Sequence, residues 1–169
     1  MKIRMLLVPC ALAFAIGCNQ NRPSYKENIQ NALKQADLTD VSVSEDAAKS
    51  TVVLGGTLRS DEDKSRAGQI AQSAAPGETI ANEISVQPVG SESEAKKIAS
   101  NLDDGIENNY KAALVSTRLD KQNISFSAKN GVLTLTGSVK HPDQRAQAQT
   151  LASKIPNVQQ VVNQIEIKR

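Results

Sequence analysis

Apolar residues recur with two different periods in the first half of this chain. Between residues 24 and 36 they are spaced three or four residues apart (Ile29, Ala32, Leu33 and Ala36), which predicts an amphipathic helix. Ser24 and Glu27 have capping-box spacing at the start of this helix. From Val41 onward, apolar and polar residues alternate as in half-buried strands, and residues 47–50 supply the connection of a hairpin.

A second helix and a last strand are predicted after the hairpin. Ser60 can cap the helix, and the three acidic residues that follow favour its positive N-terminal end. Its apolar positions have helical spacing and are rich in alanine, so this helix can approach a sheet closely (Ala67, Ile70, Ala71 and Ala74). Pro76 and Gly77 end the helix, and a final strand places Ile84 and Val86 inward. The predicted order of elements is therefore αββαβ.

The same order occurs a second time, at an offset of 81 residues. Leu54, Gly56, Leu58, Asn82, Ile84 and Val86 correspond to Leu135, Gly137, Val139, Asn163, Ile165 and Ile167. A register shared by separate elements predicts two copies of one module. One sheet with helices on one face is the natural layer arrangement for this pattern. We therefore predict an α+β fold of two tandem αββαβ modules, each a three-stranded sheet with helices packed on one face.

Local features of the second copy agree with this prediction. Its first helix is expected from about Ile106 to Leu119, Asn130–Gly131 suits a hairpin turn with positive φ, and Pro142 suits the first position of the next helix. The glycine shared by both copies, Gly56 or Gly137, indicates a close backbone approach, which we assign to a helix packing over the strand. We expect the shared asparagine side chains to be satisfied by nearby backbone groups.

The stretch between the two copies has mixed features. Residues 89–105 begin as a Gly- and Ser-containing linker, but Ala95, Ile98, Ala99 and Leu102 then show helical spacing that Ser91 could cap. Gly105 interrupts this pattern, so the segment is either a short docking helix or an extension of the next helix. The expected division is a first module over 25–88, this linker, and a second module over 106–169.

The first 17 residues are interpreted as a signal peptide. Lys2 and Arg4 precede an apolar run that is too short to span a bilayer, and small residues lie before Cys18. The segment 14–18 also resembles a bacterial lipobox, which implies that Cys18 becomes the lipidated first residue and 18–24 a short tether. The alternative is an ordinary secretory signal that contains this cysteine. By resemblance to the enterobacterial sorting rule, Asn19 indicates the outer membrane, facing the periplasm.

The repeated pattern resembles the BON domain family. The resemblance rests on a strand with the pattern Val-x-Leu-x-Gly-x-Val/Leu, an Ala-rich helix, a proline and then the pattern x-Asn-x-Ile-x-Val/Ile. It covers roughly residues 25–88 and 106–169. The resemblance implies an αββαβ fold, and two such domains behind a lipobox are similar to dual-BON periplasmic proteins and outer-membrane lipoproteins. It further implies phospholipid binding and a role in envelope integrity or stress tolerance. The family has no known catalytic residues.

Charge is distributed unevenly between the two copies. Residues 25–88 hold six basic and ten acidic residues, whereas residues 106–169 hold nine basic and four acidic residues. We predict that the second module faces anionic lipid headgroups, with Lys111, Leu114, Arg118 and Lys121 forming a contact strip on its first helix. Ordinary solvated surface is the alternative. Without Lys2 and Arg4 the chain holds 18 basic and 18 acidic residues, and it has few aromatics, which argues against nucleic-acid binding.

Catalytic chemistry is not predicted. His141 is the single histidine and lies where a helix is expected to begin, and no partners have zinc-ligand spacing. The sequence lacks a nucleophile elbow and a phosphate-binding loop, so we expect that the protein is not an enzyme and that it binds no metal or cofactor. Two functions stay open: an envelope lipoprotein that binds anionic phospholipid membranes, and a lipid-tethered adaptor that holds an envelope partner or a second copy, for instance by strand addition at a sheet edge.

Overall fold

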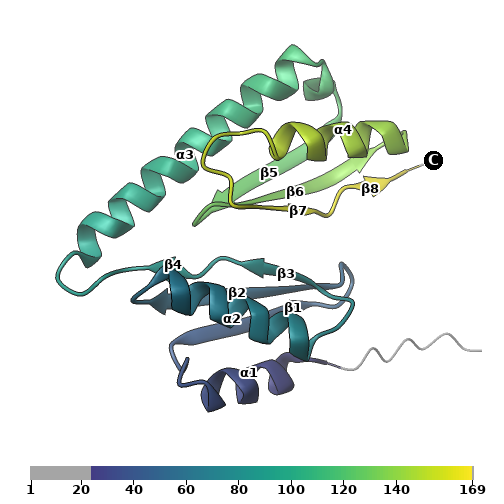
Figure 1. Ribbon diagram of the computed structural model, residues 1–169. Coiled ribbons are helices and arrows are strands. Elements are labelled where there is room, and N and C mark those ends of the chain that lie inside the picture. The colour runs from purple at the N-terminus through teal and green to yellow at the C-terminus, as the bar shows by residue number, and fades with distance from the viewer. Residues whose placement is uncertain (1–23, 169) are drawn as a thin grey trace, which may run out of the picture.

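The computed structural model describes residues 24–168, which form two modules of the same design (Figure 1). Module 1 contains α1 (Lys26–Gln35), β1 (Val41–Asp46), β2 (Thr51–Leu58), α2 (Asp61–Ala74), β3 (Thr79–Asn82) and β4 (Ser85–Val86). Module 2 contains α3 (Glu92–Ser116), the 3₁₀ turn η1 (Leu119–Lys121), β5 (Asn123–Lys129), β6 (Val132–Val139), α4 (Pro142–Ala152), β7 (Gln160–Asn163) and β8 (Glu166–Ile167). The α+β class and the tandem αββαβ order are confirmed.

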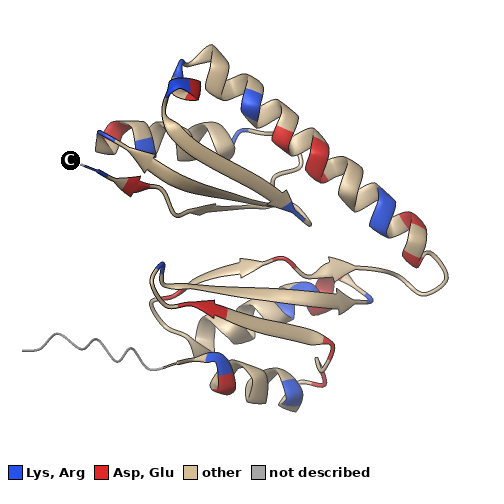
Figure 2. Cartoon of the chain, turned by 180° about the vertical axis from the view of Figure 1, so that it is seen from behind, with Lys and Arg blue, Asp and Glu red and all other residues tan. Residues whose placement is uncertain are grey.

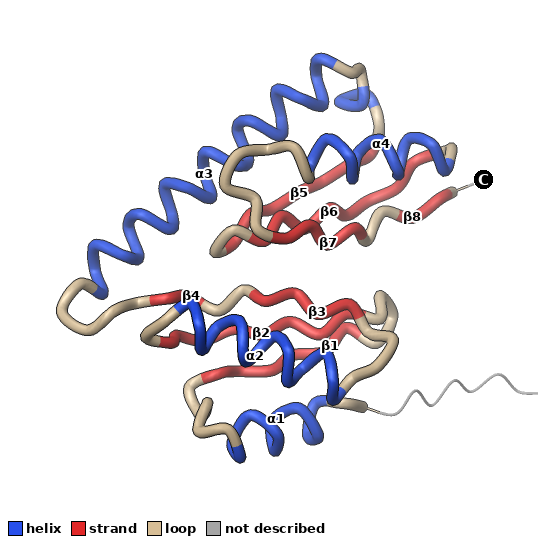
Figure 3. Tube along the Cα trace, viewed as in Figure 1, coloured by secondary structure: helices blue, strands red, loops and turns tan. Residues whose placement is uncertain are grey.

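Each sheet is built around its second strand. In module 1, β2 pairs antiparallel with β1 and parallel with both β3 and β4, and module 2 repeats this arrangement around β6 (Figure 3). The last strand of each module is therefore split in two, and each sheet counts four strands rather than the expected three. At the break in module 1 the Glu83 backbone N donates to Leu54 O over 2.9 Å, and Ile84 turns fully into the core.

The predicted inward residues of the last strands are only partly buried. Ile165 is 3% exposed and matches Ile84, but Ile167 is 43% exposed, so its predicted inward position is wrong. The reason is that β8 is a two-residue strand at the open end of the sheet, where the period-two alternation is broken by the interruption before it. Val86, the counterpart of Ile167, is half-buried.

The core of each module lies between its sheet and its two helices. Ile29, Leu33, Leu54, Ala67, Ala71 and Ile84 are buried in module 1, and Ile106, Tyr110, Leu114, Leu135, Ala148, Ala152 and Ile165 are buried in module 2. The alanines let α2 and α4 lie close to the strands. The Tyr110 hydroxyl donates to Ala148 O over 3.2 Å, and burial raises the pKa of Tyr110 to about 12.

Two of the predicted helix starts are confirmed, and two predicted side-chain caps are wrong. Ser60 caps α2, its hydroxyl accepting from the Asp63 backbone N over 3.1 Å, and Pro142 is the first residue of α4. The predicted caps at Ser24 and Ser91 are wrong, since neither side chain caps its helix. The Ser24 hydroxyl instead donates to Glu45 over 2.8 Å, because the carboxylate on the adjacent strand offers a charged acceptor.

The segment between the repeats is an extension of the next helix. α3 runs unbroken for 25 residues, compared with 10 for α1, and Gly105 lies inside it. The expected start near Ile106 is therefore wrong, because apolar spacing across Ala95 to Leu102 continues the same helix. The Asp103 carboxylate accepts from the backbone N atoms of Asn130 and Gly131, over 2.7 and 3.0 Å, and so attaches the added turns to the β5–β6 hairpin.

The shared glycines are required by the neighbouring strand and not by a helix. Gly56 and Gly137 have φ values of +101° and +99°, which side chains rarely adopt. A Cβ atom on Gly56 would lie 2.1 Å from Asp40 O, and one on Gly137 would lie 2.1 Å from Asn123 O. The predicted close backbone approach is confirmed. The approaching carbonyl belongs to the residue just before β1 in module 1 and to the first residue of β5 in module 2.

The shared asparagines do bond to backbone groups. Asn82 Nδ2 donates to Lys64 O over 2.8 Å, and Asn163 Nδ2 donates to Arg145 O over 3.3 Å. Each asparagine thus ties the last strand of its module to the helix before it, as the repeat predicts. The Asn163 Oδ1 atom also accepts from the Ile165 backbone N, across the break between β7 and β8.

The two modules pack through equivalent parts of their sheets. Gln160 bonds with its side chain to Ile80 O and Asn82 N, so the edge of β3 is covered from module 2. Asn130 Nδ2 donates to Glu83 O, and Gln164 Nε2 donates to Thr51 Oγ1. In each module, therefore, the region of the hairpin forms a hydrogen bond with a residue just after the third strand of the other module. Ala81, Val132 and Val162 form a small apolar cluster at this interface.

Candidate functional site

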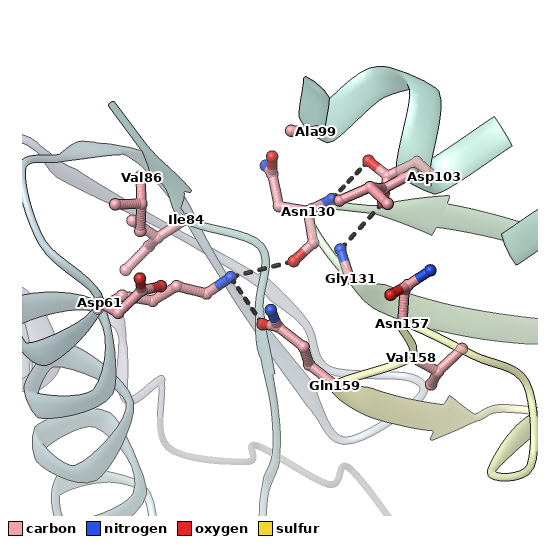
Figure 4. A pocket seen from close by; sticks show the side chains of 12 residues that line it. Asp61, Ile84, Val86, Ala99, Asp103, Asn130, Gly131, Asn157, Val158 and Gln159 are labelled. Carbon is pink, nitrogen blue, oxygen red and sulfur yellow. Dashed lines mark hydrogen bonds between the residues drawn. The ribbon is translucent and has the colours of Figure 1, made fainter. Parts of the chain in front are cut away.

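A cleft of about 280 Å³ lies at the junction of the two modules (Figure 4). Ile84 and Val86 line it from module 1, and Ala99 and Leu102 line it from the added turns of α3. Lys64 crosses between the modules, its Nζ donating to Asn130 O over 3.0 Å and to Gln159 Oε1 over 3.4 Å. Partial burial lowers the pKa of this ammonium group.

The polar groups of this cleft serve the contact between the modules. Asp103 accepts from the β5–β6 hairpin, and Lys64 donates to that hairpin and to Gln159, so both charged groups bond to module 2. In residues 24–168, no group of three or more His, Cys, Asp or Glu side chains is placed to hold a metal ion. His141 is exposed at the start of α4, as predicted.

The predicted contact strip is only partly exposed. Lys111, Arg118 and Lys121 are exposed, but Leu114 is 3% exposed and belongs to the core of module 2. Leu114 therefore cannot touch a lipid surface, and its inclusion is wrong. All four residues were predicted to lie on one helix, whereas α3 ends at Ser116 and Arg118 takes a left-handed conformation with φ 60°. A shared helical face does not extend past that end.

Basic residues gather instead where strands of module 2 begin and end. Because β5 runs antiparallel to β6 and β8 runs parallel to it, the start of β5 and the ends of β6 and β8 meet at one end of the sheet. Lys121 precedes β5, Lys140 follows β6 and Lys168 follows β8. These lysines line an open groove of about 530 Å³, called the strand-end groove here, with Gln122, Asn123, Ser138, Val139 and His141.

Lys140 and Lys168 were not predicted as site residues from the sequence. Each follows a predicted strand, but their meeting depends on which strands are neighbours, and the periodicity of a sequence does not reveal strand order. Figure 2 shows Lys and Arg residues in blue close to the C-terminus. Lys121 forms an ion pair with Asp120 over 3.0 Å. The structure gives no ion pair to Lys140 or Lys168 among the residues it describes.

The predicted lipidation site lies outside the described residues, because Cys18 precedes residue 24. Within the described range, none of the helices combines the length and the apolarity needed to cross a bilayer.

Comparison with known families identifies both modules. The BON domain matches residues 24–88 and again residues 102–169. This chain belongs to the BON domain family. The second BON match begins inside α3, at Leu102, so the first turns of that helix lie outside both matched segments. None of the curated proteins matches the sequence.

Solved structures that match this chain include two of CdsD, a structural protein of the type III secretion system of Chlamydia trachomatis. The C-terminal domain of CdsD is 13% identical, with a TM-score of 0.36, and the match covers 88% of this chain and 100% of that one. A second CdsD structure is 15% identical, with a TM-score of 0.36, and the match covers 84% of this chain and 91% of that one.

Proposed function

We propose that this chain is a non-catalytic, lipid-anchored envelope protein whose second BON domain binds anionic phospholipid. In this proposal Cys18 carries the lipid, the protein faces the periplasm from the outer membrane, and membrane binding supports envelope integrity or stress tolerance. The observation that carries the proposal is the exposed basic surface of module 2. Lys111, Arg118, Lys121, Lys140 and Lys168 are all exposed, in a segment whose charges are mainly positive.

Electrostatics favours module 2 over module 1 as the membrane-facing part. An exposed basic residue close to an anionic surface contributes about 1 kcal/mol, and several act together. Module 1 has more acidic than basic residues, so the same surface repels it on balance. A short lipid tether would hold both modules near the membrane, and the charge difference would then select module 2 for contact.

Vesicle binding tests this proposal. The chain from residue 19 onward retains every described residue and should bind vesicles that contain phosphatidylglycerol, while purely phosphatidylcholine vesicles should bind weakly. Binding should weaken as salt rises, since the attraction decays within about 8 Å at physiological ionic strength. Replacing Lys111, Arg118 and Lys121 by Ser should lower the affinity by about tenfold or more, because three basic residues are lost. Cosedimentation measures the bound fraction.

A matched variant controls for the loss of charge itself. Lys26, Lys34 and Lys49 are exposed basic residues of module 1, and replacing them by Ser removes the same charge from the acidic module. Their loss should change the affinity by less than about threefold. Equal effects of the two triple variants, or binding that ignores headgroup and salt, would contradict the proposal.

An adaptor for an envelope protein is the second candidate, and exposed apolar residues favour it. Val89 is 79% exposed, Ile98 60% and Leu102 43%, all at or near the added turns of α3. Strand addition has less support, because Gln160 covers the edge of β3 and Glu107 accepts from the Ala128 backbone N at β5. Vesicle binding that is indifferent to charge would favour this second candidate.

A further inference from the structure

The strand-end groove has the chemistry of an anion site. Three ammonium groups line it, from Lys121, Lys140 and Lys168, and no carboxylate is among its lining residues. Asn123 and Ser138 add an amide and a hydroxyl, which bond to each other over 3.4 Å. A phosphate group offers several acceptor oxygens and a negative charge, so it matches a groove lined by cations and neutral donors.

Two of the three cations are available to a ligand. The backbone N of Lys140 donates to Gln144 Oε1, and the backbone N of Lys168 donates to Val139 O. Within residues 24–168 the structure shows no hydrogen bond or ion pair from either side-chain ammonium group. Lys121 pairs with Asp120, yet its side chain is 80% exposed. The backbone bonds hold these residues in place at the strand ends, so the positive charges are concentrated there without neutralising partners of their own.

Module 1 provides an internal comparison, because its equivalent strand ends are neutralised. Arg59 and Gln87 occupy the positions of Lys140 and Lys168. Arg59 Nη1 donates to Gln87 O and to Glu92, each over 3.2 Å, and Asp40 stands immediately before β1. Backbone N–H groups, and then Arg59, lower the pKa of Glu92. The basic groove is therefore a property of module 2 that module 1 does not share.

Position favours a lipid headgroup over free phosphate as the source of the anion. The start of α1 and the end of β8 lie on the same side of the molecule in both views (Figures 1 and 2). Five residues lie between Cys18 and Ser24, so the chain between them reaches at most roughly 20 Å. A lipid on Cys18 would therefore hold this side near the membrane. Ile167, the residue before Lys168, is 43% exposed.

We infer that the strand-end groove is a discrete site for the phosphate of one anionic phospholipid headgroup, and that Lys140 and Lys168 are the main residues that bind this phosphate. The inference rests on the proposed function and makes it more specific. A diffuse attraction would depend on total charge, whereas a discrete site depends on these two positions.

Two double variants separate these cases in the chain from residue 19 onward. K140Q/K168Q should lower the affinity for phosphatidylglycerol vesicles by about tenfold or more. K97Q/K154Q removes the same charge from exposed positions outside the groove and should lower it by less than about threefold. Equal losses in the two variants would overturn the discrete site, while leaving the proposed membrane function intact.

Amide shifts measured by NMR locate the ligand directly. Monomeric dihexanoyl-phosphatidylglycerol should shift residues 138–141 and 166–168 of the wild type in a saturable way, and should leave them unmoved in K140Q/K168Q. If these shifts appear but vesicles do not bind, the groove stands and the proposed function fails. Shifts confined to other residues would overturn the groove, and saturation by inorganic phosphate at lower concentration would show that its ligand is free phosphate and not lipid.

Discussion

At the scale of single residues, the strand glycines show how backbone geometry can dictate a residue type. The positive φ at Gly56 and Gly137 places the missing Cβ against a carbonyl of the paired strand. The same position in both modules has the same conformation and the same clash, which explains the glycine in each repeat. The hydrophobic pattern alone suggested a helix above the glycine, because a pattern identifies a face and not the nearest atom.

Replacing Gly137 by Val should destabilise the protein severely. A Cβ 2.1 Å from Asn123 O and a β-branched residue at φ +99° together should cost about 3 kcal/mol or more. Gly105→Ala is the control, since this helical glycine has nothing within 4 Å of an added Cβ, and it should stabilise by about 0.5–1 kcal/mol. Denaturant unfolding measures both, and near-wild-type stability of Gly137→Val would contradict the packing argument.

At the scale of elements, α3 differs most from its counterpart. Its first turns have no equivalent in α1, and they reach the β5–β6 hairpin through Asp103. The helix thus supports module 2 from residues that a comparison of the repeats would assign to a linker. The domain division at 25–88, 89–105 and 106–169 stays a prediction, but the middle segment is part of a continuous helix.

Asp103→Ala should destabilise the protein by about 1–3 kcal/mol, because two partly buried backbone N–H groups lose a charged acceptor. Asp104→Ala is a matched control, since its side chain is exposed and makes no bond in the described structure; it should change stability by less than about 0.5 kcal/mol. Thermal unfolding of both variants provides the test. Equal losses would mean that α3 does not support the hairpin through Asp103.

At the scale of the whole molecule, the two modules pack so that module 2 covers the β3 edge of module 1. Gln160 bonds to the backbone of β3, and Ala81, Val132 and Val162 are buried between the modules. Exposed strand edges invite pairing with other chains, so this arrangement leaves fewer sites for strand addition. The paired edges also place the strand-end groove away from the interface, at the open end of module 2.

The proposed anchor determines where the whole molecule resides. Acyl chains contribute about 0.8 kcal/mol per buried CH₂, so two or more chains hold a protein stably in a membrane. Cys18→Ser should leave the protein exported but released from membranes at high salt, because only the weaker electrostatic contact would remain. Fractionation of cells measures this. Full retention of the variant in washed membranes would argue against lipidation at Cys18.

Much of the fold followed from the sequence alone, for a physical reason. Burial of apolar side chains forces a period of two in strands and of about 3.6 in helices, so Val43, Leu54 and Ala71 revealed their elements, and the repeat at 81 residues revealed the second module. Lys111, Arg118 and Lys121 are exposed, and their contact with lipid stays a prediction.

Tertiary structure alone decided which distant residues meet. Lys121, Lys140 and Lys168 come together because β5 and β8 flank β6 in opposite directions, and strand order leaves no periodic trace in a sequence. Asp103 likewise contacts the backbone of the β5–β6 hairpin, 27 positions further along the chain, and no periodic pattern predicts that contact. Periodicity reports which face of an element is buried; only the packing of elements determines what surrounds it.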